Sequence, residues 1–551
     1  MSETAHPTSN DPAVLRGIIG ELRGRLAEVQ QAREAQAAVL QERQQRIEQL
    51  LEYIELLRRK RFGPSADRVP EGQLGLFDET ELEALIGELE GDLQAQREAQ
   101  AAAPQGREAS EPQGTPVRRP LPAHLPRVEH VIDLSAAEKA AMGGDWVAIG
   151  YDVAEQLAVI PRQYYVVAYK RAKYAPRHDA APDAEAGVKI APRPAQILPK
   201  SMAHSSLAAA IVTAKFVDAL PLYRQEKGFA REGIELSRQT MAGLLIQLGE
   251  RLTPVAEALQ RLLRQGRVIH VDETRLQVLR EPGREAEQTS QMWVFCGGPP
   301  GQPVIWFHYA PSRAGAVPRQ VLLGEIGPPG ADPPDPPLGF YLQSDGYTAY
   351  HALAAEPVVL GHAGCWAHVR RKFVDAAAAR KTPGAAHEML AHIAKLYAVE
   401  RSIRGRDPAT RKAVRAERAR PLLDAIKAWL DDKVSKTLPK GLLGKAIAYA
   451  LGQWPLLTTY LTDGHLEIDN NRAENAIRPF VIGRKNWLFS GSPRGAQTSA
   501  LLYSLIETAK ANGLEPWAYL NHLFEHLPTA KTPAAVAALL PHCFKPDDLK
   551  R

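Results

Sequence analysis

Two aspartates and one glutamate, widely separated in the chain, have residue types and settings suited to phosphoryl transfer. Asp272 and Asp345 each lie in a short apolar segment, and Glu474 lies among asparagines. Three converging carboxylates repel one another and need cations, and oxygen ligands suit Mg²⁺ or Mn²⁺. Two such ions activate a water or a 3′-hydroxyl and stabilise the leaving oxygen of a phosphodiester. We therefore predict that these residues are catalytic and hold two metal ions.

Each carboxylate has an ordinary alternative when it is taken alone. Most carboxylates are simply solvated, and Asp345-Gly346 is a common turn pair. Glu474 and Arg478 are four residues apart on a helix that Asp469 or Asn470 is expected to cap, so they would also form a surface ion pair. Such a pair does not account for the asparagines beside Glu474, and the segment therefore favours a site.

Short strands and helices are expected around the two aspartates. Because side chains alternate across a strand, Glu273 should face away from Asp272. Three strands, a helix, a strand, a helix and a strand is the order of a ribonuclease H-like α/β domain, in which acids on adjacent central strands come close. The expected strands are 267–274, 292–296, 304–309, 340–345 and 358–360, and the helices are 315–323 and one that begins near 365.

The composition is that of a globular protein with several domains. The 551 residues are 45% hydrophobic and 24% charged, which excludes wholesale disorder. No apolar run is long enough to span a membrane, and the first residues do not resemble a secretion signal. Three cysteines are too few for a disulfide framework, which favours a cytoplasmic setting. The formal charge is +5, but an acidic first fifth precedes a basic remainder, which indicates a polyanionic partner or a merely well-solvated surface.

The first 62 residues carry apolar positions at heptad spacing. Two registers run from Leu15 to Leu57, interrupted by Arg33, Gln36 and Arg43. This pattern predicts a homodimeric coiled coil, with a long helix folded onto its own protein as the alternative. The next segment, to residue 126, is acidic and then rich in Gln, Ala and Pro, as in a linker. Short apolar runs at 156–160 and 164–168 suggest a small β-rich module.

Two later regions are expected to be helical. Helices on either side of Gly233, the second capped by Ser237, indicate a helix-turn-helix or plain bundle packing. Residues 376–460 also have helical patterns. Within them, the basic segment 401–420 is expected to grip a DNA backbone or to form a solvated helix face.

Taken together, these motifs resemble the insertion-sequence-sixty-six family, the TnpC-type DDE transposases. The resemblance spans most of the chain in order. It is carried by HVDET (270–274), SDGY (344–347), CWAHVRRKF (365–373), NNRAENAIRP (470–479), LPLYRQ (220–225) and LYSLIETAKANG (502–513).

The resemblance implies Asp272, Asp345 and Glu474 as the catalytic triad of a polynucleotidyl transferase. It also implies an arm with leucine-zipper and homeodomain-like character, a helical insertion in the catalytic domain and a short C-terminal domain. Family members commonly carry a zinc-finger module after the arm. Here the expected cysteine positions read AMGG (141–144) and YAPR (174–177), so zinc is unlikely in that module.

Further residues near the triad are given roles. His362, Cys365 and His368 lack the fourth ligand of a zinc site, so zinc is not expected there. The Cys-x-x-His pair is similar to one in several DDE transposase families, which implies a structural role for Cys365 and His368 beside the active site. Asn471 and Asn475 are expected to be structural residues near the catalytic site. The predicted DNA contacts are Arg370, Arg371, Lys372, Arg478, Arg484 and Lys485.

The sequence thus predicts an α/β ribonuclease H-like core with an α-helical insertion, an N-terminal coiled-coil arm and a small β-rich module. The predicted function is DNA transposition for a bacterial insertion sequence: binding element ends, freeing a 3′-hydroxyl and joining it to target DNA. A DNA-binding remnant or repressor without catalysis, and a ribonuclease H-like nuclease that cuts without joining, are the alternatives.

The expected partners are the terminal repeats of the element, target DNA, a second copy of the chain bound through the coiled coil, and accessory transposition proteins. No membrane association is expected. The expected location is the cytoplasm, at the nucleoid. The expected domains are 1–62 (coiled-coil arm), 63–126 (homeodomain-like region and linker), 127–185 (β module), 186–260 (helix-turn-helix-like), 261–375 with 461–490 (catalytic core), 376–460 (insertion) and 491–551 (C-terminal helices).

Overall fold

The computed structural model describes residues 127, 135, 137, 141, 163–174, 189–324, 339–379 and 383–549. The predicted coiled-coil arm and the linker after it lie outside the described residues. The chain divides into two compact units, of which one comprises 69–192. Its described strands are an exposed antiparallel pair, β1 (Lys173–Tyr174) and β2 (Lys189–Ile190). The run 164–168, expected to be extended in a sheet, has no regular structure, because no strand described in this unit pairs with it.

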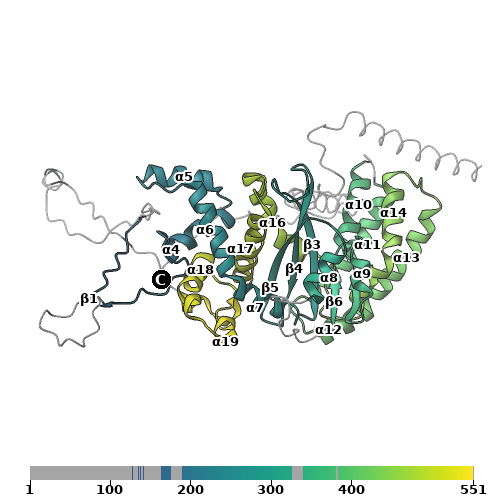
Figure 1. Cartoon of the computed structure of the whole chain (residues 1–551). Helices are drawn as coiled ribbons and strands as arrows, with labels where there is room; N and C mark the ends of the chain where they lie inside the picture. Colours follow the sequence, from purple (N-terminus) through teal and green to yellow (C-terminus); the bar gives the residue numbers. More distant parts are fainter. Residues whose placement is uncertain are drawn as a thin grey trace, which may run out of the picture. The chain divides into compact units, whose positions relative to one another are not determined.

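A five-stranded mixed sheet forms the centre of the other unit (Figure 1). Its spatial order is β5-β4-β3-β6-β7, with β3, β4 and β5 antiparallel and both β6 and β7 parallel to β3. Central strands are buried on both faces, which is why β4 is apolar through most of its length. The strands are β3 (Val268–Gln277), β4 (Thr289–Gly297), β5 (Val304–Ala310), β6 (Phe340–Gln343) and β7 (Val359–Ala363).

All five predicted strands are present, with bounds shifted by a few residues, and the first continues past residue 274. The predicted helix at 315–323 is α8 (Ala316–Leu323), and the helix expected near 365 is α10 (Trp366–Ala378). A short helix, α9 (Tyr350–Ala354), connects β6 to β7.

Two long helices, α16 (Asn471–Trp487) and α17 (Pro493–Ala511), pack on β3, β4 and β5. Helix α17 also covers the edge of the sheet. The hydroxyl of Ser504 accepts a hydrogen bond from the backbone N–H of Phe307 at 2.8 Å, and that of Thr508 accepts from Ile305 at 3.0 Å. At the opposite edge, the short helices α15 (Trp454–Thr458) and η2 (Thr459–Leu461) contact β7. Helices therefore cover both edges of the sheet.

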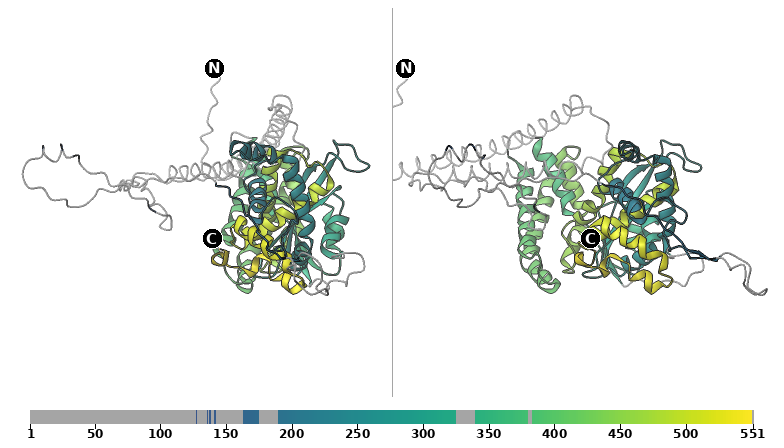
Figure 2. Two further views of the ribbon diagram at one scale, coloured as in Figure 1. Left: turned by 60° about the vertical axis from the view of Figure 1, so that its left-hand side comes forward. Right: turned by 90° about the vertical axis from the view of Figure 1, so that its left-hand side faces the viewer.

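The helical region before the sheet confirms the predicted elements. Ser237 caps its helix by accepting a hydrogen bond from the N–H of Thr240. In the turn that precedes this helix, Gly233 has the positive φ (73°) that the turn requires. The helices are α4 (Ser205–Phe216), α5 (Leu222–Arg231), α6 (Arg238–Arg251) and α7 (Thr253–Leu263). They pack with α17, α18 (Pro516–His526) and α19 (Pro533–Ala537), the last two being the C-terminal helices coloured yellow in Figure 2.

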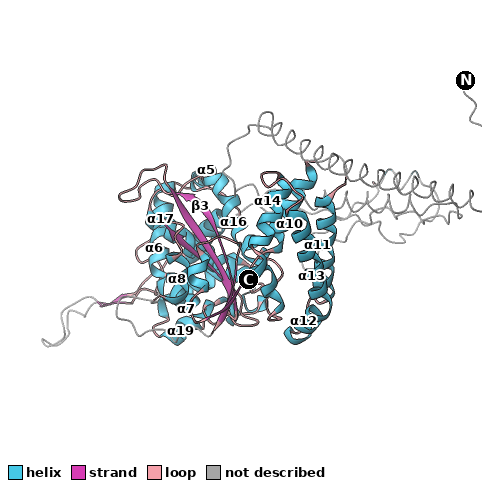
Figure 3. Cartoon of the chain, turned by 90° about the vertical axis from the view of Figure 1, so that its right-hand side faces the viewer, coloured by secondary structure: helices cyan, strands magenta, loops and turns pink. Residues whose placement is uncertain are grey.

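The helices of the predicted insertion pack with α10 in a helical layer around a second hydrophobic core (Figure 3). Its central side chains include Phe373, Ile393, Ile426 and Ile447, which come from four different helices. The elements after α10 are α11 (Ala385–Ser402), α12 (Pro408–Val414), the π-helical turn η1 (Arg415–Ala419), α13 (Arg420–Val434) and α14 (Leu442–Gly452). No helix in the described ranges combines the length and hydropathy needed to cross a membrane.

Candidate active site

The strand register brings the two predicted aspartates together. In the parallel ladder of β3 and β6, His270 lies opposite Gln343. Asp272 follows His270 by two residues within β3, and Asp345 follows Gln343 by two, just past the end of β6. Neighbouring strands are about 4.8 Å apart, so both aspartates lie near the carboxyl end of β6, and the charge of Asp345 acts on Asp272.

Helix α16 carries Glu474 to the same place because its first residues are fastened to β3. The side-chain amide of Asn470 donates to the carbonyl of Val271 at 2.9 Å, and its oxygen lies 3.1 Å from Nδ1 of His270. His270 is fully buried, and burial lowers its pKa to about 3, so the ring is neutral. Asn470 thus links the start of α16 to the strand of Asp272. Because its side chain makes no cap hydrogen bond, the N–H of Asn471 donates to the carboxylate of Asp469, at 3.2 Å.

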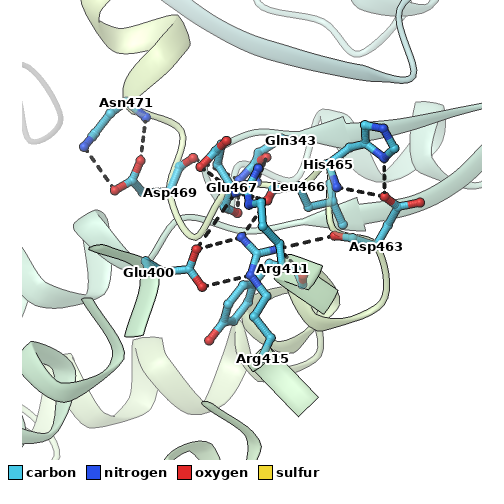
Figure 4. Close-up of polar contacts among 11 residues, drawn as sticks. Gln343, Glu400, Arg411, Arg415, Asp463, His465, Leu466, Glu467, Asp469 and Asn471 are labelled. Carbon is cyan, nitrogen blue, oxygen red and sulfur yellow. Dashed lines mark hydrogen bonds and ion pairs between the residues drawn. The ribbon is translucent and has the colours of Figure 1, made fainter. Parts of the chain in front are cut away.

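The loop that leads into α16 is held from two further directions (Figure 4). The buried amide of Gln343, at the end of β6, donates to the carbonyls of Glu467 and Asp469 at 2.6 and 2.9 Å. From the insertion, the fully buried guanidinium of Arg415 donates to Glu400 and to three carbonyls, those of Tyr460, Asp463 and Leu466. The position of Glu474 therefore depends on β6 and on the insertion as well as on β3.

The three carboxylates lie close enough for the charges of Asp345 and Glu474 to act on Asp272. The pKa of Asp272 is raised well above its usual value, first by burial and then by the charges of Glu273, Glu474 and Asp345. Among the described residues, Asp272 and Asp345 have no ion-pair partner; they accept only the N–H groups of Glu273 and Tyr347. All three acids are partly exposed. Mutually repelling, partly exposed oxygen ligands, two of which lack an ion-pair partner in the described ranges, fit a divalent cation.

Glu273, which the strand alternation predicts to face away from Asp272, is held by partners of its own. Its carboxylate is 2% exposed and is held by Arg313, whose Nε donates at 2.6 Å, and by the hydroxyl of Tyr350. Burial and the charge of Asp345 raise its pKa. This arrangement was not predicted, because Arg313 and Tyr350 lie in segments without a motif.

The predicted structural pair, Cys365 and His368, contacts the third acid. The Sγ of Cys365 and the Nδ1 of His368 lie 3.9 and 3.5 Å from Oε1 of Glu474. His362 is not part of this group, since its Nε2 is 2.8 Å from the hydroxyl of Ser344, beside Asp345. The three-residue spacing of His362, Cys365 and His368 therefore does not describe one ligand set.

The predicted DNA-contacting residues differ in how far they are engaged within the protein. Arg484 lies along β3 and donates to the hydroxyl of Thr274 at 3.1 Å and to the carbonyl of Arg275. Lys372 lies over the ring of Tyr449, at 4.5 Å. Of the other predicted DNA contacts, Lys485 is exposed, and Arg370, Arg371 and Arg478 are partly exposed. Of the two asparagines expected near the site, Asn471 is partly exposed and Asn475 is exposed.

The basic segment 401–420 has two classes of side chain. Arg415 is fully buried, and Arg411 is bonded to the carbonyl of Leu466 and to Glu467, so both guanidinium groups are engaged inside the protein instead of standing on a solvated face. The prediction is wrong for these two because charge spacing alone does not show which helix face is buried. The remaining cations of the segment, Arg401, Arg404, Arg406, Lys412, Arg418 and Arg420, are exposed.

A basic pocket that sequence reasoning missed lies beside α6. It is lined by exposed cations from three separate segments, together with neutral residues and no acid. The cations are Arg193, Lys200, Arg251 and Lys531. Their distance in sequence explains why no charge run revealed them.

Comparison with known proteins decides the family. The sequence pattern described as "Transposase IS66 family" matches residues 200–498, which include β3, β6 and α16. The chain belongs to the IS66 transposase family. Two further matches are to the "IS66 C-terminal element" at 504–542 and to "Transposase C of IS166 homeodomain" at 49–129.

Three relatives of this IS66 transposase come from Sinorhizobium fredii, and all are described as uncharacterized proteins. The protein y4qI is 31% identical over 93% of this chain and 91% of its own length. The protein y4jD is 34% identical over 78% of this chain and 82% of its own, and y4hP is 30% identical over 85% and 83%. The family supports a transposase with DNA as its partner, and the IS66 domain contains all three acids of the site.

Proposed function

We propose that the chain catalyses divalent-metal-dependent cleavage and joining of DNA strands at the ends of an insertion sequence. Asp272, Asp345 and Glu474 are the proposed catalytic triad. The observation that carries this proposal is the shared electrostatics of the three acids, which reach one site from β3, β6 and α16.

The strand arrangement supports a ribonuclease H-like core. Numbered along the chain, the sheet has the order 3-2-1-4-5, with an antiparallel meander followed by two strands parallel to the first. An acid in the middle of the first strand and another just after the fourth then lie side by side. We assign the chain to this fold on that arrangement.

The donor set of the proposed site fits Mg²⁺ or Mn²⁺. Carboxylate oxygens would supply the ligands, and two bound ions would activate the attacking water or 3′-hydroxyl and stabilise the leaving oxygen. The chain itself positions the acids: Asn470 and Gln343 fix α16, and Arg313 with Tyr350 holds Glu273 so that its charge stays beside the site. In this proposal Glu273 adds negative potential without ligating a metal.

DNA contact is proposed for the exposed basic groups. Arg370, Arg371 and Lys372 lie on α10, and Arg478 and Lys485 lie on α16, the helix that carries Glu474. The basic pocket gives a second surface, where each neutralised phosphate would add salt-dependent affinity. Dimerisation through residues 1–62, helper proteins and a nucleoid location are also proposals.

A strand-transfer assay with labelled terminal repeats tests the function. We expect Mg²⁺-dependent cleavage and joining by the unmodified chain, both lost in Asp272→Ala and Asp345→Asn, with DNA binding retained. Asp432→Asn, which changes an exposed acid on α13, is the matched control and should keep activity. Binding without cleavage at any metal concentration would favour the inactive remnant, and cleavage without joining would favour a simple nuclease.

A further inference from the structure

We propose that Cys365, His368 and Glu474 form a binding site for a thiophilic divalent cation such as Zn²⁺. The ligand atoms of these residues all lie within 4.8 Å of one another. The site contains one acid of the proposed triad but differs from it in ligand chemistry. Its effect on catalysis rests on the proposed function, whereas its existence does not.

The geometry needs little adjustment to hold an ion. With metal–ligand bonds of about 2.0–2.3 Å, a tetrahedral site sets its ligand atoms about 3.3–3.6 Å apart. The Nδ1–Oε1 distance from His368 to Glu474 is already 3.5 Å, and the Sγ–Oε1 distance from Cys365 is 3.9 Å. Cys365 is the N-cap residue of α10 and His368 lies in its first turn, so one helix end supplies two of the three ligands.

The surroundings of the ligands also suit a metal. Nδ1 of His368 is buried and makes no hydrogen bond within the described structure. The Sγ of Cys365 accepts the backbone N–H of Asn470 at 3.2 Å, which is the contact that stabilises a metal-bound thiolate. Cys365 is 3% exposed, whereas the side chains of His368 and Glu474 are 28% and 13% exposed, so an ion can enter from their side.

The ligand set favours zinc over magnesium. Sulfur and imidazole ligands bind Zn²⁺ strongly and Mg²⁺ poorly. Three protein ligands leave one position for water, which is the coordination of an exchangeable zinc rather than a closed structural one. The sequence argued against zinc because His362, Cys365 and His368 lack a fourth ligand; the fold separates His362 from the other two and brings Glu474 to them instead.

Binding at this site takes Glu474 away from the proposed catalytic ions. Because Oε1 of Glu474 faces Cys365 and His368, zinc there would turn this carboxylate from the oxygen site to the sulfur site. We therefore expect micromolar zinc to inhibit Mg²⁺-dependent strand cleavage. Cys365 and His368 are not ligands in the catalytic proposal, so their loss should remove this inhibition.

Cobalt binding to the full chain tests the site directly, without reference to activity. Co²⁺ substitutes for zinc, and its bond to a thiolate gives a charge-transfer absorption band. The chain has only three cysteines, so single Cys296→Ser, Cys365→Ser and Cys543→Ser variants assign the band. Cys543, whose Sγ is 3.5 Å from Nε2 of His542, is the most informative control.

We expect a band with one cobalt per chain that zinc displaces, that is lost in Cys365→Ser and His368→Gln, and that persists in the other two cysteine variants. Near-ultraviolet circular dichroism checks that each variant is folded. Absence of the band in the unmodified chain, or its survival in folded Cys365→Ser, would overturn the site.

The shared role of Glu474 is tested separately. Zinc inhibition is measured for each protein relative to its own zinc-free rate, and at least a tenfold weaker effect is expected in Cys365→Ser. If the cobalt site is present but zinc does not inhibit, the sharing of Glu474 is refuted. Asp272→Ala should lose cleavage and keep the cobalt band. The cobalt experiment therefore tests the metal site even if the proposed catalytic function is wrong.

Discussion

The buried guanidinium of Arg415 gives the sharpest stability prediction for this fold. The substitution Arg415→Met keeps the length and the apolar stem of the side chain but removes the charge and every donor. It leaves the carboxylate of Glu400, which is 10% exposed, without its closest partner, and it leaves the carbonyls of Tyr460, Asp463 and Leu466 without this donor.

The magnitude follows from that contact list. Removing one partner of a buried ion pair typically costs about 3–5 kcal/mol, because the other charge stays buried and uncompensated. The Arg415 side chain is 0% exposed, so solvent screening does not reduce this figure. Some of the cost is recovered because Arg411 lies 4.0 Å from Glu400 and can approach it. We therefore expect a loss near the lower end, about 3 kcal/mol.

Urea denaturation of the full chain, followed by tryptophan fluorescence, measures the loss. Arg420→Met, a change at an exposed arginine five residues along, is the control and should change the free energy of unfolding by less than about 0.5 kcal/mol. The double variant Arg415→Met with Glu400→Gln should be less destabilised than the sum of the single variants. A loss below about 1 kcal/mol for Arg415→Met, or additive single effects, would refute the reasoning.

Three other variants test the packing, the acidic site and the basic pocket. Gly464→Ala should destabilise the protein by about 1–3 kcal/mol in the same denaturation assay, because the new Cβ would lie 1.7 Å from the carbonyl oxygen of Pro408. The control Gly452→Ala places its Cβ in open space and should be neutral. Equal effects of the two substitutions would contradict this packing. Asp272→Asn should raise the Tm of the metal-free protein at neutral pH and leave it unchanged near pH 3. The pKa of Asp272 is raised in the folded protein, so its contribution to the free energy of unfolding is present at low pH and is lost as the pH rises through that pKa. A lower Tm of Asp272→Asn at neutral pH would count against the shared acidic site. Replacing Lys200, Arg251 and Lys531 together by alanine should reduce the slope of log affinity for DNA against log salt by roughly 0.9 per lost phosphate contact, and Lys445→Ala, at an exposed site on α14, should not.

The strands and most helices could be predicted because their signals are local. Apolar runs gave the five strands of the sheet, and Ser237 and Gly233 marked helix ends through their own cap and turn chemistry. The run 164–168 shows the limit of the method. It has strand composition, but a strand also needs a partner, and composition does not supply one.

The motifs pointed to the acids of the proposed site and not to the groups that support them. Asp272, Asp345 and Glu474 stood out through their motifs, and their assignment as a triad stays a prediction; the structure adds that the first two follow paired residues of β3 and β6. Arg415 looked like one of many surface cations, and only the fold shows that its helix turns it inward. His362 was grouped with Cys365 by spacing, although a strand and a helix direct the two side chains to different neighbours.

The closed edges of the sheet bear on how copies of the chain can gather on DNA. Strands with unpaired backbone groups at an edge are templates on which a second molecule can add a strand. On β5 those groups are taken by the hydroxyls of α17, and α15 and η2 lie against β7. A second molecule therefore should not add a strand to either edge of this sheet, so the sheet should not seed fibrous polymers of the chain.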